Sequence, residues 1–345
     1  MKVVGGRSWS IADFCLSNGG APGHKIWRTA DGNYEFQVQG LRNGAAVGSP
    51  CILGVLRDGI LNWFLETNDH LSFDNQCAAL VASMAGQELQ PIPLKGEWCV
   101  LNAAWSGNFY HWIQECLVKV CFLEVAGYRG NYLVPRRKFV DESMEMLGIA
   151  PDRIHIAADH GKFDFYYEIE TLLVCDRFNG AVDLCRAKGL GRYFRDWVLE
   201  RIGVTGEPVR RTYIARDHYR VVENEAELAQ VLDRHGFDRV YMDALPLKEQ
   251  IATAARSQIL VAANGAGLTH ALFLPDKASV VELASPYYAN TCIMSIANSL
   301  RHKYYGISSV SDESSYDIKV PIDVVDTLVR TLIAGQEDGH DGNRK

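Results

Sequence analysis

The second half of the chain alternates short apolar runs with amphipathic segments of helical length, and this alternation limits the possible folds more than any other feature. The predicted strands are 211–215, 240–242, 258–263 and 279–283, and the predicted helices are 225–235, 247–256 and one that begins after Gly265. Asn224 and Gly236 are residue types expected just before and just after the first helix. Strands that alternate with helices across short turns form a parallel sheet, so residues 204–315 are predicted to be a doubly wound, Rossmann-like domain.

The first half of the chain is less regular but ends in the same alternation. Runs at 34–38 and 54–59 resemble strands, and the two prolines in Gln90–Leu94 predict a break in regular structure. Strands are then predicted at 97–101, 132–134, 154–156 and 172–174, with helices at 108–126 and 138–147. This pattern predicts a largely parallel sheet covered by helices in residues 1–203.

A polar break at Thr205–Pro208 separates the two halves, and a length of 345 residues agrees with two domains. After the second domain, Pro321 opens a helix with one apolar face, assigned to residues 316–334. The polar residues 335–345 are expected to be disordered.

Composition and charge exclude several classes of protein. A net charge of −7 argues against a dedicated nucleic-acid-binding protein, which would carry a basic surplus. The nine cysteines are scattered without a CxxC pair or a cysteine–histidine cluster, so reduced thiols and no metal site are expected. The chain starts without a signal-peptide hydrophobic stretch, and no apolar run reaches the ~18 residues of a membrane span. A soluble, cytoplasmic protein is therefore expected.

The segment Ala262–His270 is the first candidate for binding chemistry. A buried strand is predicted to end there, Gly265 and Gly267 form a tight turn, and a helix begins. Free N–H groups and the dipole at a helix start favour a diphosphate, and glycine lets a ligand approach the backbone. The same turn can equally serve only to join a strand to a helix. It lacks the third glycine of a dinucleotide fingerprint, which argues against a dehydrogenase.

Three charged side chains are further candidates for binding, and Arg216 is predicted at the same edge of the sheet as Gly265. Arg216 and Arg220 follow the strand that ends at Ala215, and ligands bind at the carboxyl ends of such strands. Arginine binds phosphate oxygens in bidentate fashion, although both residues could also be solvated surface arginines. Glu282 lies inside an apolar strand, where a carboxylate must be paired or functional. It could accept hydrogen bonds from the two hydroxyls of a ribose, or form a salt bridge.

His111 and Glu115 are four residues apart on the predicted helix 108–126 and therefore share one face. A carboxylate beside an imidazole sets its tautomer and raises its basicity, so the pair could accept a proton during catalysis. A core histidine paired with a neighbour is the alternative interpretation. The sequence contains no GxSxG nucleophile elbow and no GxxxxGK(S/T) phosphate loop.

Taken in order, these segments resemble glycosyltransferase family 61 over roughly residues 97–283. The motifs that carry the resemblance are Asn108–Glu115 (Asn-Phe-Tyr-His-Trp-Ile-Gln-Glu), Tyr213–Arg216 with Arg220 and Asn224-Glu225, a helix that contains Gln250, Gly265–Thr269 followed by Leu272–Pro275, and Val280–Leu283. Two positions depart from the family pattern. Asn264 stands where a histidine is usual, and Glu115 stands where an aspartate is usual.

The resemblance implies an α/β, GT-B-like fold: two Rossmann-like domains that face each other across a cleft, with the C-terminal helix packed back on the first domain. It implies an inverting transfer of a hexosyl or pentosyl group from a UDP- or GDP-linked sugar to a hydroxyl of a saccharide or glycolipid, in bacterial surface polysaccharide synthesis. It implies no further cofactor and no metal, because protein groups supply the positive charge and the sequence has no DxD motif. Peripheral association with a membrane is compatible with such acceptors.

The resemblance also implies a set of site residues. The implied catalytic residues are His111, Glu115 and Arg216, with either His111 or Glu115 as the base. The implied donor-binding residues are Asn108, Arg216, Arg220, Gln250, Asn264, Gly265, Ala266, Gly267, Leu268, Thr269 and Glu282. Two alternatives stay open: a GT-B nucleotide-sugar epimerase, which needs no acceptor, and a non-catalytic nucleotide-sugar-binding protein, which the departure at Asn264 favours.

Overall fold

The computed structural model describes residues 2–3, 24–28, 35–47, 52–57, 60–64, 88–102, 105–158, 165–175, 189–287, 290–310 and 316–341. The chain divides into two compact units, Met1–Asp183 and Leu184–Lys345. This boundary lies before the one predicted at residue 203. The reason is that helix α7 (Leu190–Ile202) packs against other helices of the second unit.

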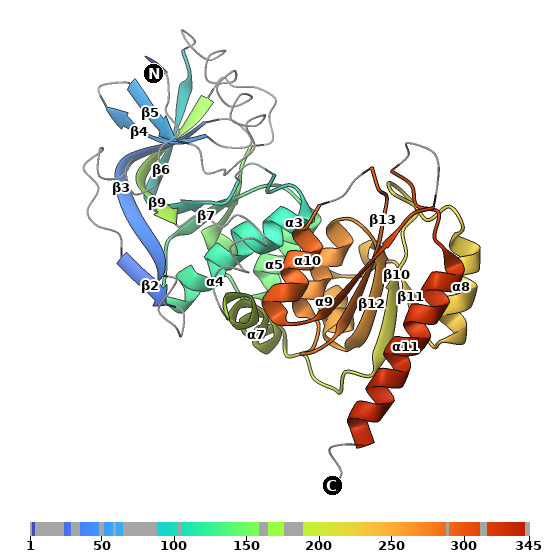
Figure 1. The fold of residues 1–345 in the computed structure, drawn as a ribbon. Coiled ribbons are helices and arrows are strands. Elements are labelled where there is room, and N and C mark those ends of the chain that lie inside the picture. Colours follow the sequence, from blue (N-terminus) through green and yellow to red (C-terminus); the bar gives the residue numbers. More distant parts are fainter. Residues whose placement is uncertain are drawn as a thin grey trace. The chain divides into compact units, whose positions relative to one another are not determined.

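The first unit contains a nine-stranded mixed sheet in the order β1-β5-β4-β3-β9-β6-β7-β8, with β2 paired to β3. The strands are β1 (Lys2–Val3), β2 (His24–Arg28), β3 (Glu35–Val47), β4 (Ile52–Arg57), β5 (Ile60–Phe64), β6 (Gln90–Val100), β7 (Asn131–Val134), β8 (Ile154–Ile156) and β9 (Phe165–Cys175). In Figure 1, β3 is the long blue strand.

Only part of this sheet is parallel. Strands β9, β6, β7 and β8 are parallel neighbours, as predicted, whereas β3 is antiparallel to β2, β4 and β9, and β4 is antiparallel to β5. Strands β3, β4 and β5 follow one another after only a few residues, and such short connections join antiparallel strands. The prediction of a Rossmann-like, largely parallel first domain is therefore wrong for this part of the sheet.

Strand β6 contains the two prolines that predict a break. Pro91 and Pro93 are in register with residues of β9, whereas β7 pairs only with Trp98–Val100. Proline lacks an N–H donor and is tolerated in a strand where that side has no partner. The predicted break at Gln90–Leu94 is wrong, because the prolines lie in a part of β6 that has one neighbour among the described strands.

The predicted helix at 108–126 is confirmed, but it contains a turn that the sequence pattern does not show. It consists of α3 (Phe109–His111), the π-helical turn η1 (Trp112–Cys116) and α4 (Leu117–Val125). The fully buried Trp112 donates from Nε1 to Ser143 Oγ over 2.9 Å. This bond fastens η1 to α5 (Lys138–Met146).

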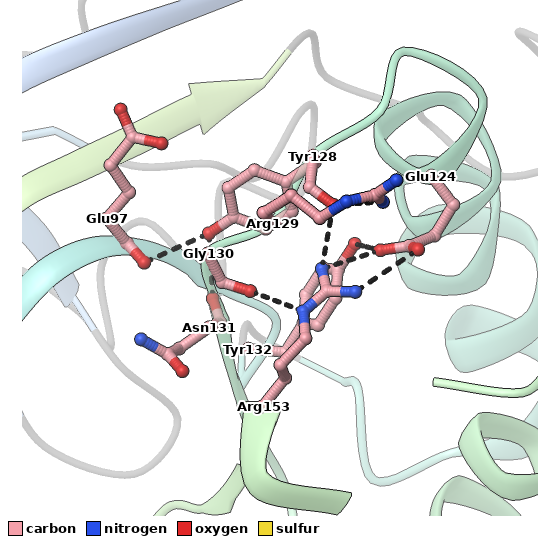
Figure 2. A network of polar contacts seen from close by, with 8 residues as sticks. All are labelled: Glu97, Glu124, Tyr128, Arg129, Gly130, Asn131, Tyr132 and Arg153. Carbon is pink, nitrogen blue, oxygen red and sulfur yellow. Dashed lines mark hydrogen bonds and ion pairs between the residues drawn. The ribbon is translucent and has the colours of Figure 1, made fainter. Parts of the chain in front are cut away.

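A polar network ties the end of α4 to β7 and β8 (Figure 2). Arg153, in the 3₁₀ turn η2 (Pro151–Arg153), donates from Nη2 to Glu124 Oε1 over 2.7 Å and from Nε to the carbonyl of Gly130 over 2.8 Å. The Tyr132 hydroxyl donates to the same Glu124 oxygen over 2.7 Å. Burial and the neighbouring Glu124 raise the pKa of Tyr132, so its hydroxyl stays protonated and donates.

Arg153→Met is expected to destabilise the first unit by about 3–5 kcal/mol, because it leaves the Glu124 carboxylate largely buried without its ion-pair partner. Urea unfolding followed by circular dichroism measures the change. Arg129→Met is the matched control, since the exposed Arg129 donates to the carbonyl of Tyr128 and pairs with no carboxylate in the described part of the chain. Equal losses in the two variants would contradict a structural role for the ion pair.

The second unit contains five parallel strands in the order β11-β10-β12-β13-β14. The strands are β10 (Arg210–Ile214), β11 (Asp238–Val240), β12 (Ser257–Ala263), β13 (Ser279–Ala284) and β14 (Lys303–Ser308). Besides α7, the helical segments are α8 (Glu225–Arg234), η3 (Met242–Ala244), α9 (Leu247–Ala255), η4 (Ala266–Phe273), α10 (Cys292–Leu300) and α11 (Ile322–Asp341). The predicted parallel sheet covered by helices is confirmed for this unit.

Helices α8 and α11 lie side by side in this unit (Figure 1). Leu232 of α8 and Val325 and Val329 of α11 share one core with Val261 of β12. Helices α7, α9 and α10 and the segment η4 pack with one another and contribute no residue to that core. Asn224 precedes α8 as predicted, but its side chain does not cap the helix. It pairs instead with the backbone N–H and carbonyl of Val320.

The C-terminal helix corrects two expectations. Its apolar face lies in the core of the second unit, whereas the prediction assigns this face to the first domain. The helix also continues to Asp341, so the segment 335–341 is helical where disorder is predicted. Its polar composition is compatible with a helix end, which needs no apolar face. Residues 342–345 lie outside the described part of the chain.

Reduced thiols are confirmed for the cysteines that the structure describes. Cys99, Cys116, Cys121 and Cys175 are buried thiols outside any disulfide, and Cys292 is a partly buried one. Cys15, Cys51, Cys77 and Cys185 lie outside the described residues. Among the described helices, none has both the length and the apolar character to cross a membrane.

Candidate active site

The carboxyl ends of β10 and β12 meet where the strand order reverses. From β10 the chain proceeds to β11 on one side, and from β12 it proceeds to β13 and β14 on the other side. In open α/β sheets, ligands bind at such a switch point, beyond the carboxyl ends of the strands. Arg216 follows β10 and Gly265 follows β12, so two predicted donor-binding residues come from this edge.

Gly265 lets the Arg216 side chain lie directly against the backbone. The φ of 153° and ψ of −178° of Gly265 belong to a region that is almost restricted to glycine. A Cβ at this position would lie 2.7 Å from Arg216 Nη1. That nitrogen donates to the carbonyl of Asn264 over 3.1 Å. The missing side chain of Gly265 is therefore required for the observed position of the guanidinium.

Arg216 and Arg220 together form a doubly cationic group. Arg220 Nη1 donates to the same Asn264 carbonyl over 3.3 Å and to Asn264 Oδ1 over 2.9 Å. Burial and the charge of Arg220 lower the pKa of Arg216, which nonetheless stays charged at neutral pH, as arginine does in proteins. Within the described residues, no carboxylate forms an ion pair with Arg216. Two guanidinium groups in this arrangement favour a polyanion such as a diphosphate.

Glu282 is enclosed by the protein. Its side chain is buried, with 1% of the residue exposed. Oε1 accepts a hydrogen bond from Asn264 Nδ2, and Oε2 accepts one from the Tyr304 hydroxyl over 2.6 Å. Burial and this bond raise the pKa of Tyr304, so it donates as a neutral phenol. The predicted ribose contact needs an accessible carboxylate, whereas here both oxygens already have protein donors.

Only the first residues after β12 are accessible to a ligand. Gly265, Ala266 and Gly267 are partly exposed, but Leu268 and Thr269 are fully buried. The predicted donor contacts of Leu268 and Thr269 would therefore require these residues to become exposed. The predicted helix is present as the eight-residue 3₁₀ segment η4, which is long for a helix of this type.

The side chains of Gln250 and His270 stabilise η4 through buried hydrogen bonds. His270 is 1% exposed, its Nδ1 donates to the carbonyl of Gly267 over 2.7 Å, and its Nε2 lies 3.0 Å from the side-chain amide of Gln250. Gln250 Nε2 donates to the carbonyl of Leu245 over 2.9 Å. Gln250, a predicted donor contact, thus supports the turn in this structure. His270 was not singled out in the sequence, where only its place shortly after the glycine turn points to it.

Acidification from pH 7.5 to pH 5 is expected to destabilise the second unit. Burial lowers the pKa of His270 to about 4, and burial together with Arg195 lowers the pKa of His302 to about 4. A histidine in an unfolded chain has a pKa of about 6.5. The unfolded state therefore binds more protons below pH 6.5. Stability that is complete above that pH is lost as the pH falls towards 4, by about 3 kcal/mol per histidine.

Urea-unfolding midpoints at the two pH values test this expectation. His302→Phe keeps a ring that cannot be protonated, so it should lose less stability on acidification than the wild type. His218→Phe is the control, because the His218 side chain is 59% exposed. The same pH dependence in His302→Phe and the wild type would contradict the assignment.

The first unit carries the predicted acid–base pair. His111 ends α3 and Glu115 lies in η1, with His111 Nδ1 at 2.7 Å from Glu115 Oε1. The side chains are 26% and 23% exposed. Among the described residues, Glu115 is the only hydrogen-bond partner of the His111 imidazole. When Nδ1–H donates to the carboxylate, Nε2 is the basic nitrogen, so the pair can take a proton from a hydroxyl.

Asn108 and Trp105 precede the His111–Glu115 pair in the sequence and form part of its environment. Asn108 is the N-cap of α3, and its Oδ1 accepts from the backbone N–H of Tyr110 over 2.9 Å. It lies in the first unit, whereas the other predicted donor contacts lie in the second. Trp105, which sequence reasoning missed, is 51% exposed, has a φ of 63° and stacks on His111 with ring centroids 6.2 Å apart. A positive φ in so bulky a residue is rare and is typical of functional sites.

The described residues contain no group of three or more His, Cys, Asp or Glu side chains that could hold a metal ion. The positive charge at the switch point comes from Arg216 and Arg220.

Comparison with known proteins decides the family. The family model described as Glycosyltransferase 61 matches residues 109–281, half of the chain, and the match includes His111, Arg216 and Gly265. The chain belongs to the glycosyltransferase 61 family.

Relatives of this family 61 protein include enzymes of animals. The EGF domain-specific O-linked N-acetylglucosamine transferase of Drosophila melanogaster is 39% identical over 107 residues, which cover 29% of this chain and 21% of that protein. The enzyme of the same description from Gallus gallus is 38% identical over 111 residues, with the same two shares. The matched segment thus spans about a fifth of the length of these relatives. A crystal structure of a family 9 glycosyl transferase from Veillonella parvula DSM 2008 covers 72% of this chain and 99% of its own, with 11% identity and a TM-score of 0.39.

Proposed function

We propose that this family 61 protein transfers a sugar from a nucleoside-diphosphate sugar to a hydroxyl acceptor, with inversion at the anomeric carbon. The observation that carries the proposal is the pair of guanidinium groups of Arg216 and Arg220 beside the Gly265 turn. The pair lies at the switch point of a parallel sheet, and no carboxylate among the described residues forms an ion pair with Arg216. This arrangement suits a diphosphate better than a neutral sugar.

The proposed reaction divides between the two units. In the second unit, the diphosphate lies on the backbone N–H groups of Gly265–Gly267 and against Arg216, which stabilises the charge on the leaving diphosphate. In the first unit, His111 accepts the proton of the attacking hydroxyl, and Glu115 stabilises the imidazolium that forms. The acceptor oxygen bonds to the anomeric carbon as the opposite carbon–oxygen bond to the diphosphate breaks. The alternative is that Glu115 takes the proton itself. The proposal includes a GT-B-like arrangement, in which both units face the same pair of substrates.

Two classes of acceptor deserve a direct test. The family pattern in the sequence favours a saccharide or glycolipid, as in bacterial surface polysaccharide synthesis. The identity of 39% to an enzyme whose name specifies EGF domains favours a hydroxyl on a folded protein domain. The same name makes N-acetylglucosamine the first sugar to test as the transferred group.

Incubation of the purified full chain with a panel of UDP- and GDP-linked sugars tests the proposal. One arm contains a polysaccharide and glycolipid extract, and the other contains a folded EGF domain. The expected result is a mass increase of one acceptor, with release of an equal amount of nucleoside diphosphate, and a loss of both in Arg216→Ala. Conversion of the donor without any acceptor would show an epimerase. Binding of the donor without turnover would show a non-catalytic binding protein, and either result would overturn the proposal.

A further inference from the structure

A continuous series of hydrogen bonds leads from β14 to the two arginines at the switch point. The Tyr304 hydroxyl donates to Glu282, Glu282 accepts from the Asn264 side chain, and Asn264 accepts from Arg216 and Arg220. We infer that Glu282 and Tyr304 are positioning residues for the donor diphosphate, because they hold Asn264 in the orientation that fixes both guanidinium groups. This inference rests on the proposed function and assigns an indirect role to two residues that do not touch the donor.

The side-chain amide of Asn264 has only one favourable orientation in this series of hydrogen bonds. An amide has a donor end and an acceptor end, and here Nδ2 faces the Glu282 carboxylate while Oδ1 faces the Arg220 guanidinium. The reverse orientation would place the amide oxygen against a carboxylate and the amide N–H groups against a cation. The buried negative charge of Glu282 therefore selects the orientation that presents an acceptor to Arg220.

The backbone of Asn264 is held from the same strand. Its N–H donates to the carbonyl of Leu283 over 2.7 Å, which continues the pairing of β12 with β13 by one residue. The carbonyl of Asn264 is thus fixed in space and accepts from both arginines. Side chain and backbone of one residue therefore place two cations that would otherwise repel each other.

Space for the Tyr304 hydroxyl is built into β14. Gly306 is the register partner of Glu282 on β13. A Cβ on Gly306 would lie 3.3 Å from the Tyr304 hydroxyl oxygen, closer than side chains normally pack. A glycine at this point lets the phenol extend along the strand to the carboxylate. Tyr305, the next residue, packs instead against the core shared by α8 and α11, so it offers a matched control.

The inference differs from a direct contact between Glu282 and the ribose in what each predicts for nucleotides. A ribose contact affects a nucleoside monophosphate and a nucleoside diphosphate equally, because both contain the ribose. Displacement of the arginines weakens binding of the diphosphate more than binding of the monophosphate, because the additional phosphate is held by the guanidinium groups.

Calorimetric titration of the full chain with UDP and UMP, and with GDP and GMP as a second pair, separates these cases. Glu282→Gln is expected to raise the Kd of the preferred diphosphate by about tenfold and Tyr304→Phe by about threefold, with a smaller change for the monophosphate. Tyr305→Phe should bind as the wild type does. Equal weakening of both nucleotides in Glu282→Gln, together with wild-type binding in Tyr304→Phe, would overturn the inference in favour of a ribose contact.

Substitutions of Asn264 provide a second, independent test. Asn264→His keeps one N–H donor for Glu282 and one ring nitrogen that can accept from Arg220, so the preference for the diphosphate should be retained. Asn264→Leu has a similar volume but neither a donor nor an acceptor. Its preference for the diphosphate over the monophosphate should fall by about tenfold. Equal binding by these two variants, each shown to be folded by its thermal unfolding, would contradict the inference.

The two levels of the proposal fail differently. A wild-type chain that binds neither UDP nor GDP contradicts the proposed function itself. A wild-type chain that prefers the diphosphate, with Glu282→Gln and Tyr304→Phe retaining that preference, contradicts the positioning role alone.

Discussion

Replacement of His111 by alanine is expected to lower kcat for sugar transfer by about 10²–10⁴-fold while the Kd of the donor changes by less than about twofold. The His111 side chain contacts Glu115 through Nδ1 and makes no other side-chain hydrogen bond among the described residues, so its Nε2 is available to accept a proton. Arg216 and Arg220, the proposed donor-binding arginines, belong to the other unit, so donor binding should not depend on the imidazole. The measurement is a steady-state assay with donor binding followed separately by calorimetry.

Glu115→Gln decides which of the two groups is the base. With His111 as the base, Glu115→Gln keeps a hydrogen-bond acceptor for Nδ1–H and loses only the stabilisation of the imidazolium, so its loss of kcat is smaller than that of His111→Ala. With Glu115 as the base, the order is reversed. His155→Ala, at an exposed position in β8, is the control for a general effect of removing an imidazole from this unit. Full activity in both His111→Ala and Glu115→Gln would show that neither is catalytic.

Gly265→Ala is expected to raise the Kd of the nucleoside diphosphate by at least about tenfold. A Cβ at this position would lie 2.7 Å from Arg216 Nη1 and 3.1 Å from Nη2, so the guanidinium must leave its place. The backbone conformation of Gly265, with φ of 153°, is also strained for alanine, which adds a cost to stability of about 1–3 kcal/mol. Calorimetric titration with UDP and GDP gives the affinity, and urea unfolding gives the stability.

Gly267→Ala separates the loss of affinity from a general effect of adding a methyl group to this turn. Among the described residues, a Cβ on Gly267 would meet the Ile214 side chain alone, at 3.7 Å, which is an ordinary contact, and Gly267 has no positive φ. The Kd of Gly267→Ala for the nucleoside diphosphate should stay within about threefold of the wild-type value. A larger loss of diphosphate affinity in Gly267→Ala than in Gly265→Ala would contradict the claim that the missing side chain of Gly265 makes room for Arg216.

The framework of the proposed donor site could be predicted from the sequence, because the relevant strands and turns are local features. Arg216 and Gly265 each follow an apolar run directly, and parallel strands place such residues at one edge. The enclosure of Glu282 could not be predicted in the same way. Its hydrogen-bond partners are 18 and 22 residues away in the sequence, and one of them lies on β14, which the sequence pattern did not single out. Strand β14 contains Gly306 and exposed residues, so its apolar pattern is weak.

The first unit shows the limits of pattern reasoning more clearly. Its helices, the end of strand β6 and the strands β7 and β8 were predictable from apolar runs of the right length. The antiparallel pairing of β3 with β9 joins residues more than a hundred positions apart, and no local pattern specifies it. The two prolines of β6 wrongly predict a break, because a strand tolerates proline where one of its sides has no partner strand. The π-helical turn that carries Glu115 has no signature in residue spacing, since the apolar positions of a π-turn and of an α-helix differ by only one residue.

Arg216 and Arg220 donate to the same carbonyl oxygen, and this arrangement affects how the protein should be stored and assayed. In the absence of an anion, Arg216 and Arg220 repel each other, so any polyvalent anion that binds between them stabilises the folded chain by mass action. Phosphate and sulfate salts would then raise the melting temperature and at the same time compete with the sugar nucleotide. Storage in phosphate and kinetics in chloride would suit the two purposes, and a donor KM measured in phosphate would report displacement of the salt as well as binding.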